Sequence, residues 1–71
     1  MNDILYEIIF YEENDNPVFV KSFIFESSRD IFFEKFKKCD TWVNVGCNIS
    51  IDFSKIKRFI KHDNYGKESS I

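Results

Sequence analysis

The chain has 71 residues and a net charge of -2, a size near the lower limit for a domain that folds without a disulfide or a metal. Nine Phe, three Tyr and one Trp offset the small size, because each buried aromatic ring removes about 150–250 Å² of surface from water. No segment approaches the roughly 18–20 apolar residues of a membrane span, and the first residues, MNDILYEIIF, lack the basic start and cleavage site of a signal peptide, so we expect a cytoplasmic protein.

Charge is distributed unevenly along the chain. Residues 1–34 contain eight acidic and two basic side chains, whereas residues 35–67 contain three acidic and eight basic side chains. The front of the chain is therefore acidic and the back is basic. Whether the two charges separate in space depends on the fold.

An antiparallel hairpin is predicted at the start of the chain. Residues 4–11 alternate as a strand does, with apolar side chains on both of its faces. Residues 12–17, EENDNP, are polar and end in proline, which indicates a turn. Residues 18–25 are rich in branched and aromatic side chains and predict a second strand.

A helix is predicted from Ser27 to Lys38. Its apolar face is expected to carry Phe32, Phe33, Phe36 and Cys39. Charged residues occupy the opposite face. Ser27 is the expected N-cap, and Asp30 completes a capping box with it. A helix of about 12 residues is marginal by itself in water, so it must cover an apolar surface.

Two further strands are predicted over residues 42–45 and 49–53, joined by a turn that contains Gly46 and Asn48. The second of these strands alternates clearly, with its isoleucines and Phe53 facing inward. Residues 54–62, SKIKRFIKH, fit a helix capped by Ser54 and fit a strand equally well, so both alternatives stay open.

These elements predict an α+β domain, with an antiparallel sheet of four or five strands and one helix packed on one face. The expected order is strand, strand, helix, strand, strand, then a short strand or helix. We expect one compact domain over residues 1–62 and a flexible polar tail over residues 63–71. The helix covers one face, so either the last element covers the second face or that face binds a partner, with a homodimer as the simplest case.

Residues that commonly carry catalysis or bind metals are scarce in this chain. His62 is the single histidine and lies next to the polar tail, and the only glycines, Gly46 and Gly66, are too far apart for a phosphate-binding loop. Cys39 and Cys47 have no metal or redox spacing, so we expect reduced thiols, with a disulfide or an intermolecular role as alternatives. The sequence predicts a protein with no enzymatic activity, no metal and no cofactor.

Two binding functions compete. Protein binding is the leading hypothesis, because an acidic hairpin turn steers toward a basic groove and surplus aromatic side chains supply interface anchors. The acidic candidates are Glu12, Glu13 and Asp15. The alternative is nucleic-acid binding by basic side chains, with Trp42 or Tyr65 available to stack on bases. The basic candidates are Lys55, Lys57, Arg58 and Lys61.

The residue usage adds a resemblance to these observations. The chain has no Ala and one Leu, and Ile, Phe, Lys and Asn abound, as in proteins with AT-rich coding sequences. In size, one-domain build and this usage it resembles the small inhibitors that phages and mobile elements make against host enzymes, including anti-CRISPR proteins. The resemblance implies stoichiometric occlusion of a host nuclease or another nucleic-acid-handling enzyme, without turnover.

Overall fold

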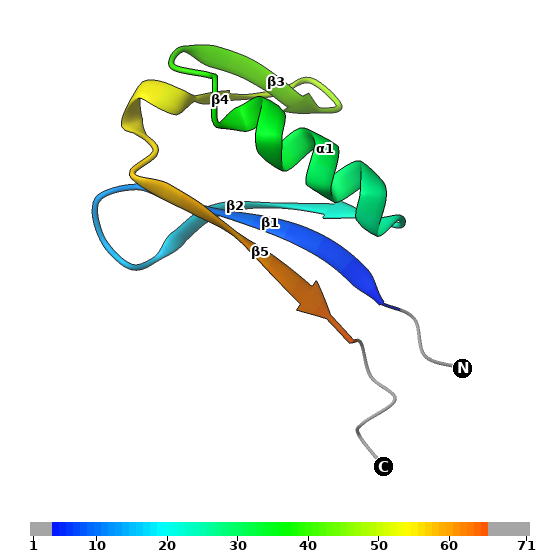
Figure 1. Ribbon diagram of the computed structural model, residues 1–71. Helices are drawn as coiled ribbons and strands as arrows, with labels where there is room; N and C mark the ends of the chain where they lie inside the picture. The colour runs from blue at the N-terminus through cyan, green and yellow to red at the C-terminus, as the bar shows by residue number, and fades with distance from the viewer. Residues whose placement is uncertain (1–3, 66–71) are drawn as a thin grey trace.

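The computed structural model describes residues 4–65, which form five strands, one α-helix and one short 3-10 helix (Figure 1). In chain order the elements are β1 Leu5–Tyr11, β2 Pro17–Phe23, α1 Glu26–Phe36, β3 Trp42–Gly46, β4 Ile49–Asp52, η1 Phe53–Lys55 and β5 Arg58–Asn64. The α+β class is confirmed.

The five strands form two sheets. The larger is antiparallel, in the order β2-β1-β5, and the smaller is the antiparallel hairpin β3-β4. The prediction of four or five strands in one sheet is therefore wrong. The hairpin lies in the same layer as the helix. Its side chains Val45 and Ile51 face the larger sheet and are buried in the core between the two layers. Alternation along a strand shows which side chains are buried, but not which layer the strand joins.

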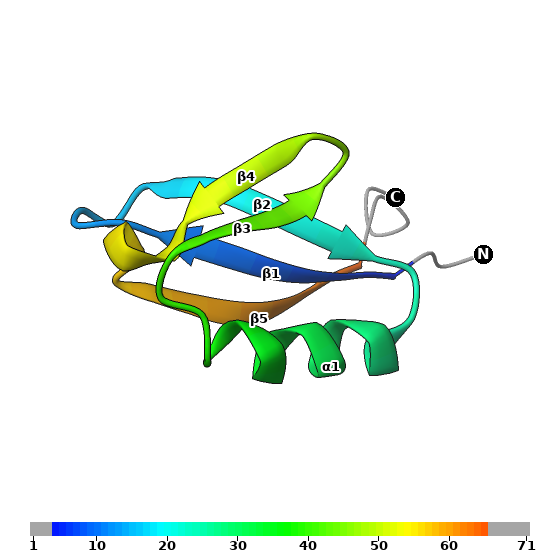
Figure 2. The same ribbon diagram turned by 90° about the horizontal axis from the view of Figure 1, so that it is seen from above.

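Helix α1 and the β3-β4 hairpin cover the same face of the larger sheet, the helix on the β5 side and the hairpin above β2 (Figure 2). The core fills the space between these two layers. Its buried apolar side chains are Ile8, Phe10, Phe23, Phe36, Val45, Ile51 and Phe53. Phe36 is 1% exposed, and Phe32 and Phe33 pack half-buried beside it, as the helical spacing predicts. Phe10 lies at the centre, with its ring 5.5 Å from that of Phe36 and 5.6 Å from that of Phe53.

The helix starts differently from the prediction. It begins at Glu26, Phe25 is the N-cap with an extended backbone, and no side chain caps the first turn. The predicted cap at Ser27 is therefore wrong, because Phe25 already accepts the first helical bond from the Arg29 amide at 3.2 Å. The Asp30 carboxylate, expected to complete the capping box, lies instead beside Arg29 and Lys61.

Residues 54–62 contain two elements. The 3-10 helix η1 continues from β4, and β5 then pairs with β1 along its full length, so the strand alternative is correct from Arg58 onward. Between them, the amide of Lys57 donates to the Tyr11 carbonyl at 2.8 Å. Strand β5 runs through Asn64, two residues into the expected tail, and residues 66–71 of that tail lie outside the described residues.

Candidate protein-binding surface

The acidic turn and part of the basic segment lie together at one end of the larger sheet. Pairing of β1 with β5 places Tyr11 opposite Arg58, so the turn after β1 lies beside the segment before β5. Arg58 Nη2 donates to Asp15 Oδ1 at 3.4 Å, and the Arg58 guanidinium lies 3.9 Å from the centre of the Tyr11 ring. The acidic turn and the start of the basic segment, whose Asp15 and Arg58 are 43 residues apart in the sequence, therefore form one mixed-charge site in the fold.

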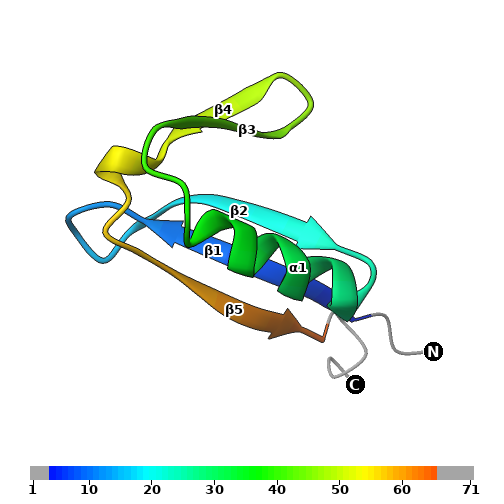
Figure 3. The same cartoon turned by 45° about the horizontal axis from the view of Figure 1, so that its top comes forward.

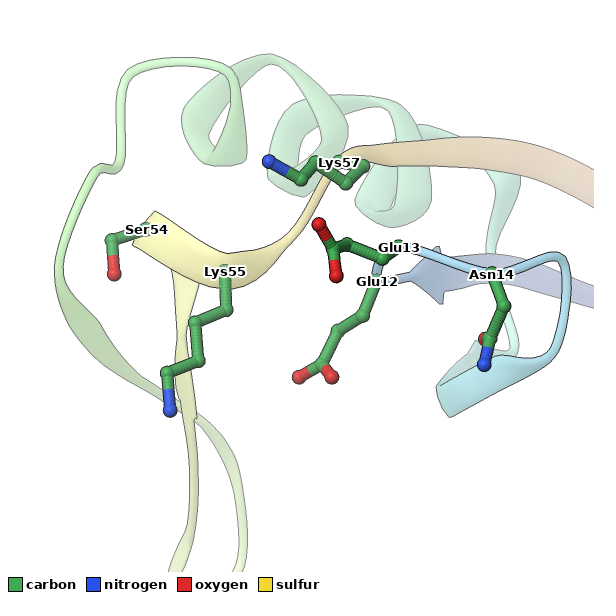
Figure 4. A pocket seen from close by; sticks show the side chains of 6 residues that line it. All are labelled: Glu12, Glu13, Asn14, Ser54, Lys55 and Lys57. Carbon is green, nitrogen blue, oxygen red and sulfur yellow. The ribbon is translucent and has the colours of Figure 1, made fainter.

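An open pocket of about 380 Å³ occupies this mixed-charge site (Figure 4). Glu12, Glu13 and Asn14 reach it from the turn, and Ser54, Lys55 and Lys57 reach it from η1 and the segment that follows. Two carboxylates and two ammonium groups share its wall. Neither the acidic nor the basic set therefore forms a surface of a single sign.

The fourth basic candidate lies elsewhere. Along β5, Lys61 and Arg58 are three residues apart and face opposite sides of the sheet. Lys61 Nζ lies 3.2 Å from Asp30 Oδ1 and 5.0 Å from the centre of the Phe33 ring, against the helix. The hydrogen bond from Lys61, followed by that from Arg29, holds the pKa of Asp30 below its ordinary value. The four basic candidates do not form one patch.

A second hollow, of about 300 Å³, separates strand β2 from the β3-β4 hairpin, and we call it the β2 groove. Its apolar wall consists of Val18, Phe19, Trp42, Ile49 and Ile51, and its polar rim consists of Glu12, Ser50, Asp52 and Lys55. Val18 is 47% exposed, Ile49 42% and Trp42 64%. Glu12 lines both hollows, so the predicted acidic turn borders the groove.

The groove lies where the β3-β4 hairpin extends past the edge of β2, and the exposure of Ile49 marks this place. Ile49 and Ile51 point to the same side of β4, yet Ile51 is buried whereas Ile49 is exposed. Figures 2 and 3 show the reason, because the hairpin crosses above β2 and extends past its outer edge. The inner side of the hairpin therefore reaches beyond the last strand of the sheet below it.

The charges at the Pro17 end of the groove are fixed by local bonds. Asp52 precedes η1 and accepts from the Ser54 hydroxyl at 2.6 Å and from the Ser54 amide at 3.1 Å. These bonds, with the nearby charge of Lys55, lower the pKa of Asp52. Asp52 is therefore a carboxylate at neutral pH. With Glu12 it faces the single ammonium group of Lys55, which leaves this end of the groove with a net negative charge.

The opposite face of the larger sheet carries no helix or hairpin among residues 4–65 (Figure 1). The last element does not cover it, since β5 adds to the edge of the sheet. The exposed apolar side chains on this face are Leu5, Val20 and Ile60. At its centre Glu7 Oε1 lies 3.1 Å from His62 Nδ1, and Glu7 Oε2 accepts from the Asn64 amide group at 3.3 Å.

Sequence reasoning missed the most buried charge in the described part of the chain. Arg29 is 4% exposed, and its guanidinium donates to Asp63 at 2.6 Å and to Asp30 at 3.1 Å. Burial lowers the pKa of Arg29, but the bonds to Asp63 and Asp30 outweigh it and raise the pKa, so the group stays charged. The signal was present, because Arg29 lies three, four and seven residues before the core phenylalanines of the helix. Helical spacing therefore places it on the buried face.

Within residues 4–65 no group of His, Cys, Asp or Glu side chains is placed to hold a metal ion, and both Cys39 and Cys47 are free thiols. No helix of that part of the chain has the length and apolar character to cross a membrane.

Comparison with known proteins gives no match to a family model, to a curated protein or to a solved structure.

Proposed function

We propose that this chain is a small non-catalytic module that binds a protein partner through the β2 groove. The observation that carries the proposal is the exposure of three large apolar side chains, Val18, Ile49 and Trp42, around one hollow in a domain this small. Exposed apolar side chains scattered singly are ordinary, but a cluster with a polar rim marks an interaction site. Trp is also among the residues enriched at the energetic hot spots of interfaces.

The acidic turn fits the same site. Glu12 lines the groove, and Glu13 and Asp15 lie in the same turn, so a partner that docks there meets carboxylates beside an apolar anchor pocket. Charges at the rim of an interface mainly raise the association rate and select the partner. The resemblance to phage inhibitors suggests that the partner is a host nucleic-acid-handling enzyme, whose basic surface such a module would occlude.

Nucleic-acid binding is the weaker candidate, because the basic side chains are divided between sites. Arg58 pairs with Asp15, Lys61 pairs with Asp30, and Lys37 pairs with Glu34 at 3.0 Å. A protein that tracks a phosphate backbone needs several free cations on one surface. Lys55 and Lys57 lie together, but they share their pocket with two carboxylates.

The proposal is tested by selecting short random peptides displayed on phage against the immobilised protein. Enriched peptides should lose binding to Trp42→Ala and keep binding to Ile31→Ala. Ile31 is the matched control, since it is 67% exposed on the helix and lies outside the groove. Both positions are exposed enough for either substitution to leave the fold intact. Failure to enrich any peptide, or equal binding to both variants, would refute the proposal.

A mobility shift with single-stranded and double-stranded DNA at low salt tests the other candidate. We expect no shift. A shift that weakens steeply with salt and disappears when Lys55 and Lys57 become Glu would favour nucleic-acid binding instead.

A further inference from the structure

We propose that the partner contributes an extended segment that adds to the free edge of β2 as a fourth strand of the larger sheet. This inference rests on the proposed function and names the form in which the partner enters the β2 groove. An edge strand offers every second backbone N–H and C=O group to a new neighbour. Strand addition uses those groups for affinity and uses side-chain pockets for specificity.

The two edges of the larger sheet differ in how they are protected. Strand β5, RFIKHDN, carries charged or ionisable side chains at four of its seven positions, the kind of residue that discourages strand addition. Strand β2, PVFVKSF, carries one charge, Lys21, whose ammonium group lies 5.1 Å from the centre of the Phe23 ring on the covered side. Only Pro17, at its first position, lacks a backbone N–H. Among residues 4–65 no strand pairs with the outer edge of β2, and this edge carries fewer charges than that of β5.

The β2 groove has the position of a missing strand. The hairpin extends past the outer edge of β2 (Figure 2). Ile49, the first residue of β4, is 42% exposed and lines the groove together with Val18 and Phe19 of β2. A strand added beside β2 would lie under Ile49, with alternate side chains directed up into the groove against Phe19 and Ile49. Its other side chains would extend the uncovered face beside Val20. The segment therefore needs apolar residues at alternate positions.

A single extended segment fits this place better than a second copy of the chain. A copy that paired through its own β2 would bring its own hairpin above that strand, as Figure 1 shows for this one. The layer above the place beside β2 is already occupied by the hairpin of the first copy, which extends past the edge of β2. Two hairpins would then compete for one layer, whereas a lone strand carries nothing above it.

Charge gives the segment a polarity. The Pro17 end of the β2 groove is lined by the carboxylates of Glu12 and Asp52 and by the ammonium group of Lys55. The later half of β2 carries Lys21. A segment with a basic residue near Pro17 and an acidic residue near Lys21 therefore complements both ends. Opposite charges that face each other on paired strands are stabilising, whereas like charges in the same positions are destabilising.

The test uses the peptides selected on the groove and places a methyl group on each backbone nitrogen in turn. A methylated nitrogen can no longer donate, so methylation should weaken binding about tenfold or more at every second residue and little at the residues between. Hydrogen exchange of the whole protein supplies the second readout. Peptide binding should slow the exchange of alternate amides between Val18 and Phe23, with no comparable change in β5.

Each outcome decides a different claim. Period-two sensitivity together with protection of β2 supports strand addition. Peptides that need Trp42 but tolerate methylation at all positions would overturn strand addition and leave the proposed function standing. Failure to select any peptide removes both. A dimer in solution whose β2 amides are protected without peptide would show that a second copy fills the place beside β2, which overturns the proposed occupant.

Discussion

The buried Arg29 cluster predicts a large effect from a change that leaves the apolar core untouched. Arg29→Met keeps a long unbranched side chain and removes the guanidinium. The short bond to Asp63, 2.6 Å, joins an arginine side chain that is 5% exposed to a carboxylate that is 37% exposed. A hydrogen bond between charged groups contributes about 1.5–3 kcal/mol, and partial solvent exposure of Asp63 moves this toward the lower end.

The remaining contacts of the guanidinium contribute less. Glu26 at 3.4 Å and Asp30 at 3.1 Å are both about half-exposed, and such pairs are worth roughly 0.2–0.5 kcal/mol each. The Arg29 guanidinium also lies 5.4 Å from the centre of the Tyr6 ring. We therefore expect Arg29→Met to lower the free energy of unfolding by about 2–3 kcal/mol. For a domain of this size that loss corresponds to a fall in Tm of about 8–24 °C.

Urea unfolding followed by tryptophan fluorescence measures the change, and Lys37→Met is the matched control. Lys37 forms a bond of similar length, 3.0 Å to Glu34, but both side chains are more than half-exposed. We expect the control to lose at most about 0.5 kcal/mol. If the free energies of unfolding of the two variants differ by less than about 0.5 kcal/mol, the desolvation penalty of burying Arg29 equals the stabilisation from its hydrogen bonds. The cluster then does not stabilise the fold.

Three further predictions concern the core, the acid sensitivity and the turn of the hairpin. Phe36→Ala should lower the free energy of unfolding by about 3–5 kcal/mol, measured in urea, because Phe36 is 1% exposed among other rings. The pKa of Asp30 is lowered in the folded state, so the ionised carboxylate stabilises the fold above its unfolded pKa, and this stabilisation is lost as the pH falls through its folded pKa. Asp30→Asn should therefore show a smaller loss of Tm below about pH 4 than the wild type does. Asn48 has a φ of 57°, so Asn48→Val should cost about 1–2 kcal/mol and Asn48→Gly should be nearly neutral in the same urea assay.

Local patterns in the sequence predicted most of the elements. Alternation located strands β1, β2 and β4, and helical spacing placed Phe36 in the core. These predictions succeed because the side-chain periods of strands and helices depend only on nearby residues. The same patterns contain no information on layers. The short β3-β4 hairpin therefore looked like a continuation of the main sheet, although it packs above it.

The candidate site was harder to predict because it depends on contacts between distant segments. The acidic turn and the basic segment around Lys55 were separate hypotheses, and the register of β1 against β5 merges them into one site. The β2 groove forms because the hairpin extends past the edge of the sheet. The alternation of residues along a strand does not predict where one layer lies over another. Of the residues that line the groove, the sequence singled out Glu12 as an acidic protein-binding residue, Lys55 as a basic candidate and Trp42 as an exposed stacking surface.

The small size of the domain links its stability to its binding surface. A chain of 71 residues buries only about 60% of the surface that its unfolded form exposes, so some apolar side chains stay in water in any fold it adopts. Three of them, Val18, Ile49 and Trp42, lie around one groove, where the upper layer extends past the sheet below. A partner strand at β2 would complete the lower layer under the hairpin. Binding would then bury the apolar surface that three strands leave exposed, and the bound protein should unfold at a higher urea concentration than the free protein.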